Sequence, residues 1–178
     1  MKFNNDMLRL YAVTDRHWTG EQTLYEQVRD VLMGGATCLQ LREKDLDEAS
    51  FYEEAKNIKE LCRLFDVPFI INDNVMLAKE IDADGVHVGQ DDMACVKARE
   101  ILGPDKIIGV SAHTIEEARI AKEHGADYLG IGAIFPTSSK DDAEVLGIKR
   151  LKEMTDTVDL PMAVSYTHLR AHETAANL

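Results

Sequence analysis

The chain has 178 residues, 45% of them hydrophobic and 29% charged, which suits a single soluble globular domain with a substantial core. Its formal net charge is -12 at pH 7, which argues against nucleic acid or an anionic membrane surface as the main partner, because each phosphate contact needs a cation. Residues 1–6 lack the apolar core of a signal peptide, and no apolar run is long enough to span a bilayer, so we expect a cytoplasmic protein.

Short apolar runs alternate with amphipathic segments along the chain. The apolar runs predict strands at residues 8–14, 38–42, 69–72, 85–88, 107–111, 128–134 and 160–164. The amphipathic segments predict helices at residues 21–33, 49–65, 75–81, 94–102, 115–123 and 148–154. Capping signals support three helix starts: Thr19 with Gln22, Asn74, and Thr114 with Glu117.

Strict alternation of apolar strands with helices predicts a parallel sheet that helices cover, either doubly wound or closed into a (β/α)8 TIM barrel. Polar residues favour the barrel, because barrel enzymes take their functional groups from the carboxyl ends of many strands. Such residues follow several predicted strands here: Arg42, Asn72, Gly89, Ser111 and 135–137. A Rossmann fold is disfavoured, since neither a Gly-x-Gly-x-x-Gly turn nor a Walker-type loop is present.

Residues 40–44 read Gln-Leu-Arg-Glu-Lys and close the second predicted strand. The period of two in a strand places Gln40, Arg42 and Lys44 on one face. In a chain with this much negative charge, two cations that point the same way indicate a site for an anionic ligand.

Carboxylates follow the next two predicted strands. Asp73 comes directly after residues 69–72, and Asp92 follows residues 85–88. At a shared barrel mouth the two can converge on Mg²⁺, which takes one or two protein carboxylates and completes its shell with water and phosphate oxygens. Each aspartate taken alone is more often an ordinary helix-entry residue that stabilises the first turn. Beside the two cations, the pair favours a site for magnesium and diphosphate.

Other polar residues lie after the fifth and sixth predicted strands. The hydroxyls and Lys140 of residues 135–141 suit phosphate oxygens, although such loops are more often solvated connections. Ser111 and His113 offer a hydroxyl and an imidazole, and His113 would also suit a surface or capping residue. The sequence contains no acyl-transfer triad.

The three cysteines, Cys38, Cys62 and Cys95, are odd in number and far apart. None of them forms a Cys-x-x-Cys pair, which argues against disulfides and structural zinc. We expect all three to be small buried apolar side chains.

Six short motifs occur in order along the chain, at residues 11–15, 40–44, 71–73, 85–92, 109–114 and 135–140. Together they resemble the motif series of the thiamine phosphate synthase family, a family of (β/α)8 barrels. The resemblance implies a transferase that condenses 4-amino-2-methyl-5-hydroxymethylpyrimidine diphosphate with a thiazole phosphate. The products would be thiamine phosphate and diphosphate, and both substrates are small molecules.

The resemblance also assigns roles to individual residues, with Ser111 and Lys140 as the catalytic ones. Grouped by ligand, the residues are Arg42, Lys44, Asn72 and Lys140 for diphosphate, Asp73 and Asp92 for magnesium, Gln40 for the pyrimidine, Ser111 beside the leaving group and reacting ring, and Thr137 and Ser139 for the thiazole phosphate. Ser139 stands where the family pattern has threonine, and the hydroxyl is kept.

The end of the chain departs from the family pattern. After residues 160–164 the pattern has a glycine pair, an eighth strand and a closing helix, whereas residues 165–178 contain no glycine and no clear periodicity. We expect an incomplete barrel domain at 1–164 and a non-native tail at 165–178, in which His168 and His172 lack a third ligand for zinc. The first and seventh strands would then be unpaired, and we expect the chain to be poorly stable and weakly active or inactive.

Two other enzyme classes and a pure binding module stay open. A paralogue related to thiazole tautomerase would lack the magnesium carboxylates and diphosphate cations. A sugar-phosphate epimerase or isomerase would need a base beside a carbon acid, and neither His87 nor His113 has an evident carboxylate partner. Association into a homo-oligomer also stays open.

Overall fold

The computed structural model describes residues 2–90, 92–135 and 145–165. Its strands are β1 (Tyr11–Val13), β2 (Cys38–Leu41), β3 (Phe69–Asn72), β4 (Gly85–Val88), β5 (Ile107–Ser111), β6 (Tyr128–Ile131) and β7 (Met162–Val164). Its helices are α1 (Leu24–Met33), α2 (Glu48–Leu64), α3 (Val75–Glu80), α4 (Asp92–Leu102), α5 (Ile115–Glu123) and α6 (Gly147–Thr157), with the 3-10 turns η1 (Asn5–Leu8) and η2 (Arg16–Trp18).

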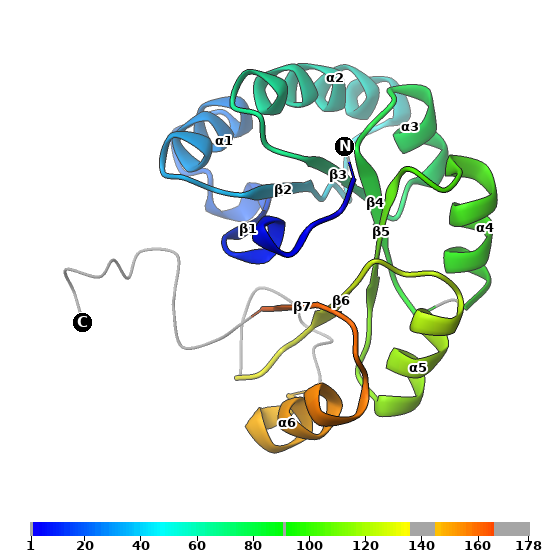
Figure 1. Ribbon diagram of the computed structural model, residues 1–178. Coiled ribbons are helices and arrows are strands. Elements are labelled where there is room, and N and C mark those ends of the chain that lie inside the picture. Colours follow the sequence, from blue (N-terminus) through cyan, green and yellow to red (C-terminus); the bar gives the residue numbers. More distant parts are fainter. Residues whose placement is uncertain (1, 91, 136–144, 166–178) are drawn as a thin grey trace.

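The strands pair in chain order, each parallel to the next, and curve into a nearly closed barrel with the helices outside (Figure 1). This arrangement confirms the predicted TIM-type barrel, with seven of the eight strands in the described part of the chain. β3, β4, β5 and α5 have the predicted bounds. The predicted start of the first strand at residue 8 is wrong. The side chain of Asn4 accepts the Asp6 N–H at 3.0 Å and turns the chain into η1.

Alternation of side chains along the strands divides the core into two layers. In β2, Leu39 and Leu41 belong to the main apolar cluster, which the helices cover, whereas Cys38 belongs to a smaller cluster inside the barrel. The inner cluster consists of Met7, Cys38, Ile70, Ile107 and Tyr128, with Phe3, Leu8, Tyr11 and Ala163 packed against it. The N-terminal segment therefore closes one end of the barrel interior (Figure 1). The carboxyl ends of the strands are left for polar residues.

All three cysteines are free and buried, as predicted. Burial raises the pKa of the Cys38 thiol well above its usual range and that of Cys62 to about 12. The pKa of Cys95 is also raised by burial. Thiols in this state are poor nucleophiles, so the cysteines serve packing.

The N-terminal cap of α1 differs from the predicted one. Thr23, not Thr19, forms the capping box: its hydroxyl accepts the Glu26 N–H at 3.2 Å, and the Glu26 carboxylate accepts the Thr23 N–H at 2.9 Å. Thr19 instead ends η2, and its hydroxyl donates to the Arg16 carbonyl at 3.0 Å. The predicted capping box at Thr114 and the predicted cap at Asn74 are confirmed.

Replacement of Thr23 by alanine is expected to lower the free energy of unfolding by about 1 kcal/mol, because the Glu26 N–H in the first turn of α1 loses its acceptor, the Thr23 hydroxyl. Thr19→Ala is the matched control, with an expected change within about 0.5 kcal/mol. Urea denaturation of both variants measures the difference. Equal destabilisation would contradict the placement of the helix start.

The barrel is open between its first and last strands. Among the described residues β1 pairs only with β2 and β7 only with β6, and the two lie at the ends of the curved sheet (Figure 1). The predicted unpaired edges are thus present in this part of the chain. The Ser165 N–H still donates to the Ile131 carbonyl at 2.9 Å, one residue past the predicted domain end. The prediction for the tail, with His168 and His172, lies outside the described residues.

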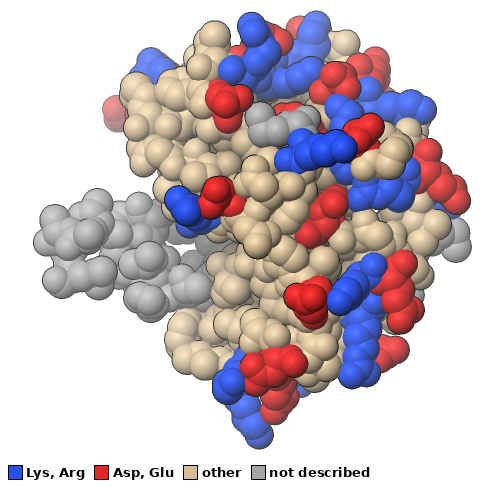
Figure 2. Space-filling model, viewed as in Figure 1, with Lys and Arg blue, Asp and Glu red and all other residues tan. Residues whose placement is uncertain are grey.

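Charges of both signs are interspersed around the helices on the face drawn in Figure 2. Exposed pairs within helices, such as Arg63 with Glu60 at 2.9 Å and Lys152 with Asp156 at 2.8 Å, contribute to this pattern. Pairs of this kind add little to stability. Within the described ranges, no helix has the length and apolar character that crossing a membrane requires.

Candidate active site

The barrel brings several predicted site residues to the carboxyl ends of adjacent strands. Asn72 of β3 lies opposite His87 of β4 in the parallel register. Leu41 of β2 lies opposite Ile71 of β3, so Arg42 follows at the level of Asn72. The diphosphate residues predicted on β2 and β3 are therefore neighbours at the mouth of the barrel. Lys44, also predicted, lies exposed two residues beyond Arg42.

Thr14 fixes the backbone of Arg42. Its buried hydroxyl accepts the Arg42 N–H at 2.9 Å and lies 3.3 Å from the Arg42 carbonyl, to which it donates. The Thr14 N–H donates to the Gln40 carbonyl at 3.0 Å. Sequence reasoning included Thr14 only as part of a motif. Its role depends on contact between the ends of β1 and β2.

An ion pair to the buried side chain of Glu43 holds the residue after Arg42, with the Arg16 side chain 41% exposed. Arg16 Nε donates to the Glu43 carboxylate at 2.9 Å, and the Arg16 guanidinium also pairs with Glu54 of α2. The Glu43 side chain is only 3% exposed. Burial raises the pKa of Glu43, and the hydrogen bond from Arg16 opposes that rise. The segment that carries the two predicted anion-binding cations is therefore anchored on both sides of Arg42.

Asp73 has a left-handed backbone, with φ 62°, directly after β3. This conformation is costly for a residue other than glycine and is held here by its neighbours. The Asp73 N–H donates to the His87 carbonyl at 2.8 Å, and the Asn72 side-chain amide donates to the Asp73 carboxylate at 2.7 Å. Asp73 directly precedes Asn74, which caps α3 by accepting the Leu77 N–H at 2.9 Å, so the alternative role of Asp73 as a helix-entry residue stays a prediction.

The exposed Asp73 carboxylate is suited to a hard cation at the barrel mouth. Asp92 begins α4, and its side chain lies outside the described part of the structure. The residues that the structure describes contain no cluster of three acidic, histidine or cysteine side chains. Mg²⁺ does not need such a cluster, since water and phosphate oxygens supply most of its ligands. The donor set therefore fits magnesium held by one or two aspartates.

A hydrogen-bonded row of side chains crosses the barrel interior below the mouth. Gln40 Nε2 donates to Tyr11 Oη at 3.0 Å, and Tyr11 Oη lies 2.6 Å from Tyr128 Oη. Tyr128 Oη lies 3.0 Å from His87 Nδ1, and His87 Nε2 lies 2.9 Å from Ser111 Oγ. Two predicted substrate-binding residues, Gln40 and Ser111, are thus joined through three residues to which sequence reasoning gave no such role.

Glycines make room for this row. A Cβ at Gly109 would lie 2.1 Å from Tyr128 Cζ, and a Cβ at Gly130 would lie 2.7 Å from His87 Cε1. The ring of Phe3 stacks on that of Tyr128, with centroids 5.8 Å apart. Glycines that alternate with larger residues in strands were the available signal, since they often mark close approach of another group.

His113 has a carboxylate partner, contrary to expectation. Its Nδ1 lies 3.5 Å from the Glu117 carboxylate. The same carboxylate accepts the N–H groups of His113 and Thr114, at 2.6 and 3.2 Å, as part of the cap of α5. The pair therefore belongs to a helix start. Thr114 is the N-cap of α5, and His113 directly precedes it and contributes its backbone N–H to the same carboxylate.

The predicted residues of the loop after β6 lie outside the described residues. These are Thr137, Ser139 and Lys140, so their roles stay predictions. The described part of this region ends at Phe135, whose side chain is 39% exposed.

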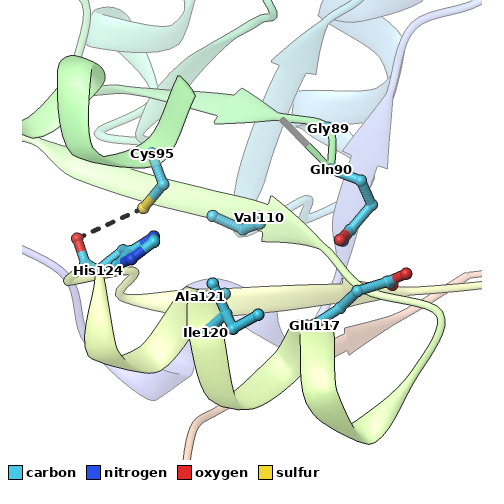
Figure 3. A pocket seen from close by; sticks show the side chains of 8 residues that line it. All are labelled: Gly89, Gln90, Cys95, Val110, Glu117, Ile120, Ala121 and His124. Carbon is cyan, nitrogen blue, oxygen red and sulfur yellow. Dashed lines mark hydrogen bonds between the residues drawn. The ribbon is translucent and has the colours of Figure 1, made fainter. Parts of the chain in front are cut away.

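A small cavity lies on the outer side of β4 and β5, between α4 and α5 (Figure 3). Its volume is about 10 Å³, and Val110, Ile120 and Ala121 line its middle. At one end the Cys95 Sγ lies 3.5 Å from the His124 carbonyl. This space suits about one water molecule and is far too small for a substrate.

Comparisons with known proteins show the family of this chain. The family model described as thiamine monophosphate synthase matches residues 10–165. The thiamine-phosphate synthase of Clostridium acetobutylicum is 49% identical over 154 residues, which is 86% of this chain and 73% of the relative. The protein of the same name from Desulfitobacterium hafniense is 51% identical over 154 residues, 86% of this chain and 74% of the relative.

Solved structures show the same likeness. The thiamine phosphate pyrophosphorylase from Pyrococcus furiosus has a TM-score of 0.79 and 39% identity, over 90% of this chain and 75% of that one. The 3-dehydroquinate dehydratase from Geobacillus kaustophilus, at 14% identity and a TM-score of 0.64 over 87% of this chain and 72% of that one, shares the fold alone. The chain therefore belongs to the thiamine monophosphate synthase family.

Proposed function

We propose that this chain is a thiamine-phosphate synthase. It joins 4-amino-2-methyl-5-hydroxymethylpyrimidine diphosphate to the nitrogen of 4-methyl-5-(2-phosphoethyl)thiazole, or of its carboxylate, and releases diphosphate. The observation that carries this function is the family match over residues 10–165, with relatives about half identical that bear this enzyme's name. The cluster of Arg42, Asn72 and Asp73 at adjacent strand ends supports it.

The chemistry explains why a catalytic nucleophile is unnecessary. The amino group of the pyrimidine ring donates electrons, so its exocyclic methylene can ionise when the departing diphosphate is stabilised. The bond from methylene carbon to diphosphate oxygen breaks with both electrons on oxygen, and the thiazole nitrogen then supplies the electron pair for the new carbon–nitrogen bond. Fixed positive groups aimed at the leaving group act where charge develops.

We assign the diphosphate to Arg42, Lys44, Asn72 and Lys140. The backbone contacts of Thr14 and the ion pair of Glu43 hold the segment from which both Arg42 and Lys44 extend. A guanidinium can bind two phosphate oxygens at once, and Lys44 adds a point charge. The pyrimidine lies against Gln40 and Ser111, and Thr137 and Ser139 contact the thiazole phosphate.

We further propose that Asp73 and Asp92 hold Mg²⁺. When bound, the ion would neutralise the charge that develops on the leaving diphosphate. The contribution of this chain is the orientation of the Asp73 carboxylate by the Asn72 amide. Because Asp73 has an otherwise unfavourable backbone conformation, its placement at the mouth is consistent with a ligand-binding role.

Removal of divalent metal is expected to lower the rate of diphosphate release by about 10²-fold or more, because several kcal/mol of charge stabilisation is lost. The purified chain is incubated with both substrates and Mg²⁺, and diphosphate and thiamine phosphate are separated and measured. EDTA is expected to lower the rate to this extent, and excess Mg²⁺ is expected to restore it.

Control reactions separate this function from its alternatives. Omission of the thiazole phosphate should prevent formation of thiamine phosphate. Rearrangement of a thiazole carboxylate phosphate without diphosphate release would indicate a tautomerase. Exchange of a carbon-bound hydrogen in a sugar phosphate would indicate an epimerase or isomerase. Product formation without a divalent metal would contradict the proposed magnesium site but not the proposed reaction.

A further inference from the structure

The row of side chains across the barrel interior has a hydrogen-bond direction. Gln40, Tyr11, Tyr128, His87 and Ser111 come from or adjoin five different strands and form one continuous series of contacts between 2.6 and 3.0 Å. Gln40 Nε2 can only donate, so Tyr11 Oη is the acceptor in the first bond. The direction of every later bond depends on where the Tyr11 proton lies.

Both tyrosines keep their protons. Burial raises the pKa of Tyr11 and that of Tyr128 well above the usual range of a phenol. The proton of Tyr11 has a strong acceptor in Tyr128 Oη at 2.6 Å. The opposite direction would turn this proton towards the sulfur of neighbouring Cys38, which is a weak acceptor. A bond donated by Tyr11 to Tyr128 is therefore the direction that gives the Tyr11 proton an oxygen acceptor.

The tautomer of His87 follows from this direction. Because Tyr128 Oη accepts from Tyr11, its own proton is available to His87 Nδ1 at 3.0 Å. His87 Nδ1 then acts as an acceptor, and a neutral imidazole carries its proton on Nε2. His87 Nε2 donates to Ser111 Oγ at 2.9 Å. The proton of Ser111 must consequently point away from His87.

We propose that His87 is a positioning residue that acts through Ser111: the directed row fixes the His87 Nε2–H tautomer, so that Ser111 presents its hydroxyl proton to an oxygen of the departing diphosphate. The inference rests on the proposed function for the identity of that ligand. Ser111 is then a hydrogen-bond donor, and His87 does not remove its proton. The same row also holds the Gln40 amide. The residue that contacts the pyrimidine and the residue that contacts the leaving group are therefore fixed by one series of hydrogen bonds.

The surroundings of the rings support a positioning role. Gly130 leaves the space that His87 Cε1 occupies, and Gly109 leaves the space of the Tyr128 ring. Phe3 stacks on Tyr128 from the closed end of the barrel. Ser111 ends β5 and is half-buried, so its hydroxyl lies between the row and the mouth. Fixed rings of this kind hold a donor in place before the ligand binds.

The tautomer is measured directly by NMR on the chain with ¹⁵N-labelled histidine. The chain has six histidines, and a His87→Asn spectrum identifies the signals of His87. We expect a neutral ring with the proton on Nε2. A ring protonated on Nδ1, or on both nitrogens near pH 7, overturns the inference. This measurement does not depend on catalytic activity. It is made on the unsubstituted chain, and His87→Asn serves only to assign the signals.

Binding of inorganic diphosphate with Mg²⁺, followed by calorimetry, tests the action through Ser111. Tyr128→Phe keeps the ring but removes the donor to His87, and Ser111→Ala removes the final hydroxyl. Each is expected to weaken binding by about tenfold, the scale of one hydrogen bond. The double variant should be no weaker than Ser111→Ala alone, because both changes act through one hydroxyl. Tyr25→Phe on exposed α1 is the matched control, with unchanged binding.

The outcomes separate this inference from the proposed function. Additive losses in the double variant, or no diphosphate binding by the unsubstituted chain, overturn the role of His87. Formation of thiamine phosphate together with an Nδ1–H tautomer overturns the inference and leaves the function intact. Diphosphate binding, the Nε2–H tautomer and coupled losses without formation of thiamine phosphate would overturn the function and support the positioning role.

Discussion

Replacement of Lys140 by alanine is expected to lower the turnover number by about 10²–10³, the scale of one donor that stabilises developing negative charge. The role assigned to Lys140 is contact with the departing diphosphate. Its charge then matters most when the bond to the methylene carbon is largely broken. The turnover number should therefore fall more than KM rises, because the interaction is stronger in the transition state than in the bound substrate.

Steady-state release of diphosphate, with inorganic pyrophosphatase as the coupling enzyme, measures this change. Lys97→Ala is the matched control, since Lys97 is an exposed lysine of α4, and its removal should leave turnover within a factor of two or so. Undiminished turnover in Lys140→Ala would remove Lys140 from the site. A rise in KM alone would reduce its role to substrate binding.

The Gly109→Ala variant is expected to lose about 3 kcal/mol or more of folding free energy. The new methyl group would lie 2.1 Å from Tyr128 Cζ and 2.3 Å from Tyr128 Oη. Tyr128 cannot move aside easily, because it is 1% exposed and held by Phe3, Tyr11 and His87. Overpacking of this kind forces shifts of backbone or rings. Such a loss is a large share of the stability of an ordinary domain.

Thermal and urea unfolding of the variant measure the loss. Gly89→Ala is the matched control, since a Cβ at Gly89 meets nothing within 4 Å and the residue does not have a positive φ. The control should change stability by no more than about 0.5 kcal/mol. If both variants were equally stable, the tight packing of Tyr128 against β5 would be wrong.

The identity of the elements could be predicted from sequence because it depends on local patterns. Apolar runs bounded by polar turns marked β3, β4 and β5 to the residue, and Thr114 with Glu117 marked the start of α5. The start of α1 was predicted wrongly, since Thr19 and Thr23 both have a glutamine or glutamate three residues later. The 3-10 turn η2, which makes Thr19 a C-cap, decided between them.

Part of the candidate site was also available from sequence. Parallel strands carry their ends to one edge, so Arg42, Asn72 and Asp73 could be expected to lie near one another. The carboxylate partner of His113 was missed. The hydrogen bond between the Arg42 N–H and the Thr14 hydroxyl was missed too, because these residues are 28 positions apart and meet at the ends of two strands. The roles of Lys140 and Asp92 and the weak stability expected of the open barrel stay predictions.

The sequence by itself determined the alternation of strands and helices, the barrel class and the polar strand ends, because each follows from periodicity and order along the chain. Only the tertiary structure decided that Tyr11 and Tyr128, 117 residues apart, share a hydrogen bond inside the barrel. A tyrosine in a strand can face the helices or the barrel interior, and the curvature of the sheet into a barrel determines which side chains it contacts. The direction of the row from Gln40 to Ser111 follows from those contacts, since buried donors and acceptors must satisfy one another.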